Sequence, residues 1–200
     1  EIEVEAATLM ITRLSGAHER MDIDEREQDF SRLATPIAKY WLTKQSTPVV
    51  REALECVGGN GYVEDSMMPR LYREAPLNAI WEGAGNVIAL DIGRAASRNP
   101  ESVEVFLDEL DQSRGKDSGI DNLLDSLRAD FASPVPEAEA RRLVERLAIA
   151  WAATLMVQHG QPSVSEAYLM SRIGGDHGSL FGTLPTSCDL DQIARRAVPA

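Results

Sequence analysis

The sequence has few of the residues that build metal centres and disulfide frameworks. Its 200 residues include three histidines and two cysteines, Cys56 and Cys188. Because the cysteines lie far apart, no disulfide framework is expected, and the cytoplasm is the expected compartment. We expect both thiols to be packed rather than reactive. The histidines do not stand near carboxylates or cysteines at ligand spacing, so no metal site is predicted.

Basic charge and long apolar runs are also scarce. Twenty Lys and Arg residues face 32 Asp and Glu residues, which gives a formal net charge of -12. Binding to nucleic acid without sequence preference requires clustered basic side chains, so this composition argues against it. The longest apolar run, Leu147 to Val157, is shorter than the roughly 20 residues that cross a bilayer. It predicts a buried helix, and no membrane association is expected.

Nearly every segment has helical rather than strand periodicity, which predicts an all-α fold. The first apolar stripe ends near Gly16 and comprises Ile2, Ala6, Leu9, Met10 and Leu14. The chain starts within this amphipathic pattern, so we expect it to be a piece of a longer protein. Helices missing from the piece would leave the stripe exposed and favour self-association.

Two prolines suggest interruptions after the first helix. A second helix is predicted over 29–44, where Pro36 marks a kink or a late start. Thr47 and Pro48 resemble an N-cap followed by proline at the first helical position, which predicts a separate third helix. That helix is expected to end before Gly58.

The remaining patterns predict a short helix at 69–74, a helix from Val87 to the Asn99-Pro100 stop, and a further set of helices beyond it. We therefore predict two parts: residues 1–98, which carry the functional segments, and residues 99–200, an additional helical module of short-looped bundle helices. Arg70, Arg73 and Glu74 are interpreted as an exposed helix face with i, i+4 pairing.

Residues 55–62, ECVGGNGY, bring three glycines to a predicted helix end. Glycine is the usual residue just past a helix, so a purely structural cap is one interpretation. Two consecutive glycines and a third after Asn60 exceed what a cap requires. The bare backbone N–H groups of such a turn suit an anion such as a pyrophosphate, which is the functional interpretation.

A single carboxylate stands in the segment 80–86, IWEGAGN. Ile80 and Trp81 precede Glu82, and a flexible Gly-Ala-Gly follows it. We expect a crowded turn that keeps Glu82 out of bulk water, near the double-glycine bend, where it can act as a general base. The alternative interpretation is an ordinary surface carboxylate.

Three motifs together resemble the C-terminal helical domain of acyl-CoA dehydrogenases: ALECVGGNGY at 53–62, PRLYREAP at 69–76 and IWEG at 80–83. The residues WEGAGNVI at 81–88, with the extra helices after Asn99, are most similar to the AidB-like branch associated with the alkylation response. The resemblance covers residues 1–97 for the family at large and the whole chain for the branch.

The resemblance implies a homotetrameric FAD enzyme in which a glutamate removes the α-proton of an acyl-CoA thioester while a hydride leaves the β-carbon for FAD. Glu82 stands at the position of this base, with Trp81 and Gly83 beside the substrate. The positions that contact FAD, partly that of a neighbouring subunit, are Glu55, Gly58, Gly59, Ala84, Gly85 and Asn86.

Two positions depart from the family pattern. The family commonly has Gln where Glu55 stands, and a carboxylate repels phosphate unless it binds a ribose, an adenine or a backbone amide. Ala84 replaces the usual Thr and offers no hydroxyl near the flavin. These changes weaken the case for classical β-oxidation more than the case for flavin binding.

The alternative is an AidB-like DNA-associated flavoprotein in which residues 99–200 form a nucleic-acid or oligomerisation module. A third interpretation is that this module only holds subunits together, and the acidic outer faces favour it over DNA binding. On its own the fragment is expected to be inactive and to lack bound FAD.

Overall fold

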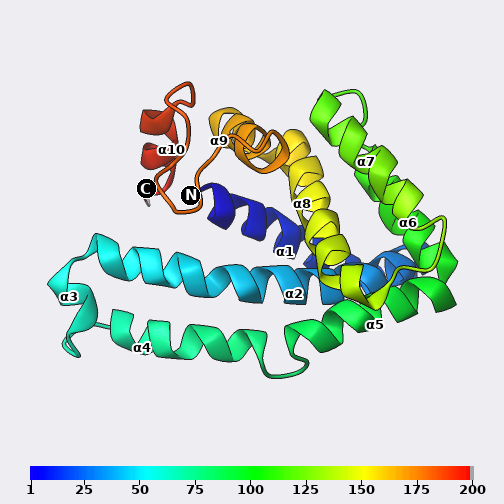
Figure 1. The fold of residues 1–200 in the computed structure, drawn as a ribbon, viewed down its shortest axis with the longest axis horizontal. Helices are drawn as coiled ribbons and strands as arrows, with labels where there is room; N and C mark the ends of the chain where they lie inside the picture. The colour runs from blue at the N-terminus through cyan, green and yellow to red at the C-terminus, as the bar shows by residue number, and fades with distance from the viewer. Residues whose placement is uncertain (199–200) are drawn as a thin grey trace.

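The computed structural model describes residues 1–198, and all regular elements in this range are helices (Figure 1). The predicted all-α class is confirmed. The α-helices are α1 (Ile2–Arg20), α2 (Glu25–Cys56), α3 (Gly59–Tyr62), α4 (Met68–Glu74), α5 (Gly85–Arg98), α6 (Pro100–Asp111), α7 (Ser118–Asp130), α8 (Ala140–His159), α9 (Pro162–Tyr168) and α10 (Leu190–Arg196). Two 3₁₀ turns, η1 (Ala75–Ala79) and η2 (Glu137–Glu139), and one π-helical turn, η3 (Leu169–Ile173), complete the set.

Helix α2 is a continuous rod of 32 residues, and the predicted division at its prolines is wrong. Asp24 caps its start, because its side chain accepts hydrogen bonds from the backbone N–H groups of Arg26 and Glu27. Pro36 and Pro48 both lie inside the helix. A proline in a helix interior costs about 3 kcal/mol, but the buried face of α2 packs against α1, α5, α6 and α8, and this packing keeps the helix intact.

Helix α1 is longer than predicted, and its apolar stripe is more buried than predicted. It continues through Gly16 to Arg20, because one glycine weakens a helix without ending it. The stripe from Ile2 to Leu14 is buried except for the partly buried Leu9, and Met10 has no accessible surface. Helices α8 and α9 pack on α1. The expectation that this stripe is open to solvent is therefore wrong, because the C-terminal half of the same chain covers it. Self-association of the chain stays a prediction.

One hydrophobic core runs through both halves of the described chain. At its centre Trp151 of α8 packs edge-on against Phe30 of α2 and Phe106 of α6, at ring-centroid distances of 5.5 and 5.7 Å. Phe30 and Phe106 stack on each other at 5.7 Å. The apolar run around Leu147 lies in α8, as predicted. The division into residues 1–98 and 99–200 stays a prediction, but the two stretches share this core.

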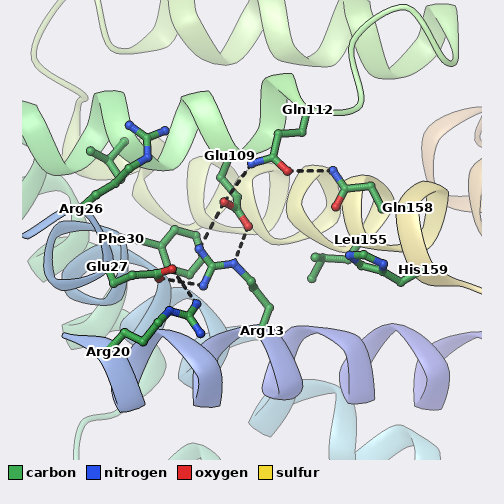
Figure 2. Close-up of a pocket in the computed structure, with 11 residues that line it drawn as sticks. Arg13, Arg20, Arg26, Glu27, Phe30, Glu109, Gln112, Leu155, Gln158 and His159 are labelled. Carbon is green, nitrogen blue, oxygen red and sulfur yellow. Dashed lines mark hydrogen bonds and ion pairs between the residues drawn. The ribbon is translucent and has the colours of Figure 1, made fainter. Parts of the chain in front are cut away.

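A partly buried ion network crosses the same boundary (Figure 2). The guanidinium of Arg13 in α1 binds Glu109 of α6 through two contacts, Nε to Oε1 at 2.6 Å and Nη2 to Oε2 at 3.2 Å. Its Nη1 donates to Glu27 of α2 at 2.8 Å, and its face lies 4.1 Å from the ring centroid of Phe30. The network lines a cavity of about 350 Å³.

The carboxylate of Glu27 is shared between two arginines, since Arg20 also donates to it at 2.6 Å. Burial alone would favour the neutral acid. The hydrogen bonds from Arg20 and Arg13 outweigh that effect and hold the pKa of Glu27 below its ordinary value. The ionised form of Glu27 is therefore part of the folded structure.

Two further carboxylates of α1 bind the C-terminal elements. Glu3 accepts a hydrogen bond from Arg172 Nε, on the π-helical turn η3, at 2.8 Å. Glu5 accepts from the backbone N–H of Gln161, which precedes α9, at 2.6 Å and from Arg196 of α10 at 3.1 Å. These contacts fix α9 and α10 against the start of the chain. Among residues 1–198, no helix has the length and apolar character needed to cross a bilayer.

Candidate functional site

The glycine segment lies at the end of α2, where the chain turns into the short helix α3 (Figure 1). Gly58 adopts φ +61°, a left-handed conformation that favours glycine. Gly61 is needed for packing, because a Cβ there would collide with the Leu54 carbonyl oxygen and lie 2.8 Å from Val57 Cγ2. A Cβ on Gly59 would meet nothing within 4 Å, so neither backbone conformation nor packing requires glycine at this position.

The side chains beside these glycines are open to solvent. Glu55 is exposed and accepts a hydrogen bond from Arg51 at 3.1 Å, one turn earlier in α2. Cys56 is an exposed free thiol, so the prediction that both cysteines are packed is wrong for Cys56 and confirmed for Cys188. The two thiols differ because Cys56 ends a helix at the molecular surface, whereas Cys188 is buried. Burial raises the pKa of the Cys188 thiol.

The second segment forms the turn between η1 and α5. Glu82 has φ +53°, and Gly83 follows with φ +114°. A left-handed conformation costs free energy for a residue with a side chain such as Glu, and residues held in it are found mostly at functional sites. Ala84 precedes α5 and provides no side-chain cap, so the first N–H groups of α5 have no capping partner from it.

The predicted enclosure of Glu82 is wrong for this chain. Glu82 is exposed, and Ile80 and Trp81 are 62% and 55% exposed. Because Ile80 and Trp81 are themselves on the surface, they do not shield the carboxylate from solvent. Of the other predicted positions, Gly83 is half-buried, Ala84 and Asn86 are exposed, and Gly85 is buried.

The structure does not bring the two segments together within one chain. Gly61 lies against Leu54, whereas Gly85 lies against Lys44 of the same helix. The helical rise places Lys44 and Leu54 about 15 Å apart. Figure 1 agrees, since α3 lies at one end of the molecule and the α4–α5 connection lies near its middle. Within one chain the two segments therefore do not form one site, and the expectation that both face a single pocket built with a second chain stays a prediction.

The exposed helix face of Arg70, Arg73 and Glu74 in α4 is confirmed, but Arg73 is paired across a loop rather than along the helix. Arg73 binds Glu64 in a two-pronged contact at 2.8 and 3.2 Å, across the α3–α4 loop and not along the helix. The hydrogen bond from Arg73 lowers the pKa of Glu64. Both side chains are exposed, so this pair orders the loop more than it stabilises the fold.

Sequence reasoning missed two features of this region. Tyr40 and Lys44 of α2 contact Gly85, although neither stands near a recognisable motif. The stretch from the end of α2 to the start of α5 also carries many exposed apolar side chains, namely Val57, Tyr62, Val63, Met67, Leu71, Tyr72, Leu77, Ile80, Trp81 and Val87. The signal available in the sequence was the large number of apolar residues in a segment with weak helical periodicity. Residues 1–198 contain no group of three or more His, Cys, Asp or Glu side chains that could hold a metal ion.

Comparison with known proteins assigns the family. The model of the acyl-CoA dehydrogenase C-terminal domain matches residues 1–97, which include both segments. Residues 1–97 belong to the acyl-CoA dehydrogenase family. This assignment confirms the resemblance found in the sequence motifs.

The relatives include AidB of Escherichia coli (strain K12), which is 32% identical over 167 residues, covering 84% of this chain and 30% of AidB. Acyl-CoA dehydrogenase family member 11 of Caenorhabditis elegans is 36% identical over 118 residues, covering 58% of this chain and 19% of that protein. The crystal structure of Caenorhabditis elegans ACDH-11 in complex with C11-CoA superposes with a TM-score of 0.71 at 25% identity, covering 98% of this chain and 38% of that one. This chain therefore spans well under half the length of these acyl-CoA dehydrogenase relatives.

Proposed function

We propose that this chain is the C-terminal part of an FAD-dependent flavoprotein of the acyl-CoA dehydrogenase type, in which Glu82 removes the α-proton of an acyl-CoA thioester. The observation that carries the proposal is the left-handed backbone at Glu82, directly before α5, in a segment that matches the family. A non-glycine residue held in this conformation marks a position where side-chain direction matters.

The Glu82 carboxylate can accept a proton from a substrate because it projects from the turn and is accessible. A weak carbon acid gives up its proton efficiently only when water is excluded and the developing charge is stabilised. In this chain Trp81 and Ile80 are exposed, so the substrate and the rest of the protein can pack against them and exclude water from Glu82. Gly83 leaves room for a close approach of the thioester.

The residues of both segments fit FAD. At the tip of α2, the Gly58 and Gly61 N–H groups are bonded within the turn, to the carbonyl oxygens of Glu55 and Gly58, so the expectation of bare N–H groups is wrong for these two glycines. No atom crowds the Cβ positions of Gly58 and Gly59, and the Glu55 carboxylate can accept hydrogen bonds from a ribose hydroxyl or an adenine amine. At the start of α5, Ala84, Gly85 and Asn86 offer backbone N–H groups. When bound, FAD would accept the hydride that leaves the β-carbon.

The separation of the two segments supports an oligomer. Because they lie about 15 Å or more apart along α2, one chain cannot present both to the same part of one flavin. We propose that the glycine tip of one subunit serves the flavin held beside the Glu82 turn of another, as in a homotetramer. The exposed apolar side chains of α3 and α4, such as Tyr62, Leu71 and Tyr72, are consistent with burial in such an assembly.

The test uses the complete flavoprotein that contains this chain. Glu82→Gln keeps the size of the side chain and removes its basicity, so anaerobic bleaching of the flavin by a panel of acyl-CoA thioesters should be lost while FAD content is kept. Glu101→Gln, on the exposed first turn of α6, is the matched control and should bleach like the unmodified protein. Normal bleaching by the Glu82 variant would refute the assigned role.

The DNA-associated alternative draws on the similarity to AidB. The charges of this chain oppose it, since the net charge is -12 and arginines of the C-terminal half face carboxylates, such as Arg146 with Asp130 and Arg196 with Glu5. DNA binding through phosphates weakens steeply with salt. We expect no salt-dependent duplex binding by this chain, and its detection in an electrophoretic shift assay would favour the alternative.

A further inference from the structure

The helical run that leads into the Glu82 turn ends against a lysine of α2. Lys39 Nζ donates a hydrogen bond to the backbone carbonyl oxygen of Asn78, in the 3₁₀ turn η1, at 2.5 Å. Both residues are half-buried, and η1 packs against α2. Asn78 lies four residues before Glu82. Lys39 therefore connects the long helix to the backbone just ahead of the turn.

The Asn78 carbonyl is the one that a continuing helix would use for Glu82. In an α-helix the N–H of each residue bonds to the carbonyl oxygen four residues earlier, which would pair Glu82 with Asn78. The two N–H groups that follow η1 instead both bond to the carbonyl oxygen of Leu77, at 2.9 and 3.1 Å. No backbone bond within residues 1–198 joins Glu82 to Asn78, whose carbonyl oxygen binds Lys39. The helical run therefore ends at the carbonyl that Lys39 binds, and the left-handed turn follows.

The sign of the Lys39 charge suits the end of a helical run. The last carbonyl groups of a helix carry partial negative charge and have no partner within the helix. A lysine near a helix C-terminus can bind these carbonyls and interacts favourably with the helix dipole. The hydrogen bond from Lys39 thus gives the Asn78 carbonyl a partner at the point where the chain leaves the helix.

The other side of Glu82 is fixed by packing. Gly83 has φ +114°, and a Cβ built on it would lie 3.1 Å from Cγ1 of Ile88, a buried residue of α5. Glu82 thus lies between two fixed points, the Asn78 carbonyl before it and the contact of Gly83 with Ile88 after it. Because the Glu82 side chain is exposed, its direction depends on this backbone.

We propose that Lys39 is a positioning residue for Glu82: by binding the Asn78 carbonyl oxygen, it ends the helical run and holds the backbone that carries the left-handed Glu82. This inference rests on the proposed function of Glu82. It assigns a role to a residue of α2 that lies outside the sequence motifs and acts through the backbone, not through the carboxylate.

The experiment compares Lys39→Met, which keeps the length of the side chain and removes its charge and N–H donors, with Lys39→Arg, which keeps both. Lys116→Met, in the exposed turn after α6, is the control for loss of one positive charge. All variants are made in the complete flavoprotein. The measurements are the limiting rate of anaerobic flavin reduction by an acyl-CoA thioester, its half-saturation, FAD content, unfolding temperature, and amide hydrogen exchange of residues 80–84.

Misplacement of a reacting group by about 1 Å can cost about a hundredfold in rate. We expect Lys39→Met to reduce the limiting rate by about tenfold or more, with half-saturation and FAD content nearly unchanged, and to speed exchange at residues 80–84. The unfolding temperature should also change little, because water can reach the half-buried Asn78 carbonyl. Lys39→Arg should restore most of the rate, and Lys116→Met should match the unmodified protein.

Exchange at residues 80–84 that is the same in Lys39→Met and the unmodified protein would overturn the inference, and so would an unchanged limiting rate. Equal losses of rate and unfolding temperature in the Met and Arg variants would also overturn it, because packing alone would then explain them. If the unmodified flavoprotein is not reduced by any thioester, the proposed function fails instead. The exchange measurement then still decides whether Lys39 holds the turn.

Discussion

The ion pair between Arg13 and Glu109 offers a sharp test of how the two halves of the chain are joined. Its two contacts, at 2.6 and 3.2 Å, connect α1 to α6, and the Glu109 side chain is only 12% exposed. Glu109→Gln keeps the shape of the residue and removes its charge. The Arg13 guanidinium then loses one of its two carboxylate partners while it remains over Phe30.

The expected loss of stability follows from the burial of the pair. Removing one partner of a fully buried pair costs about 3–5 kcal/mol, whereas a single hydrogen bond to a charged group contributes about 1.5–3 kcal/mol. Arg13 keeps Glu27 as a partner and its side chain is 21% exposed, so the lower range applies. We expect a loss of about 2 kcal/mol, which lowers the unfolding temperature of a chain of this size by about 4–8 °C.

Urea unfolding followed by tryptophan fluorescence measures this loss. Glu104→Gln is the matched control on the same helix: its side chain is 68% exposed and lies 3.5 Å from Arg128, so its loss should stay below about 0.5 kcal/mol. Since one core spans both halves, each variant should unfold in a single transition. A Glu109→Gln variant as stable as the control, or two separate transitions, would refute this account.

Two further predictions concern Glu27 and the glycines of α3. Because its arginine partners lower the pKa of Glu27, its stabilising contribution is complete above the ordinary value of 4.5 and is lost as pH falls through the lower folded-state value; Glu27→Gln should flatten the acid side of a plot of unfolding free energy against pH, and an unchanged slope would contradict this. Gly61→Ala should destabilise the chain by about 1–3 kcal/mol, since its Cβ would collide with the Leu54 carbonyl oxygen, while Gly59→Ala, with open space around it, should fold normally in the same urea assay.

Local patterns in the sequence were sufficient for the fold class and for several helix ends. Helical periodicity, the Gly58 stop after Cys56 and the Asn99-Pro100 break all correspond to helix boundaries in the structure. The glycine and glutamate segments were also found, because they combine unusual residues at fixed spacing. These features depend only on residues close together in the sequence, so the sequence alone is enough to predict them.

What the sequence could not predict depends on contacts between distant residues. The prolines of α2 are tolerated because long-range packing outweighs a local cost, and that packing is not visible in the residues around Pro36 or Pro48. Likewise, the burial of Met10 depends on α8 and α9, which pack on α1. The apolar neighbours of Glu82 indicated neither its exposure nor its left-handed backbone. The contact of Lys44 with Gly85 joins two helices and has no local signal.

The uninterrupted course of α2 has a mechanical consequence. At 1.5 Å per residue, its 32 residues measure about 48 Å, and its first half is clamped in the core while its Cys56 end stands at the periphery. A continuous helix of this length is stiff, so it keeps a fixed distance between its Cys56 end and the aromatic cluster around Trp151. Inserting or deleting one residue beyond Trp41 would rotate the Cys56 end by about 100°. The length of α2 therefore sets both the distance and the orientation of this end relative to the core.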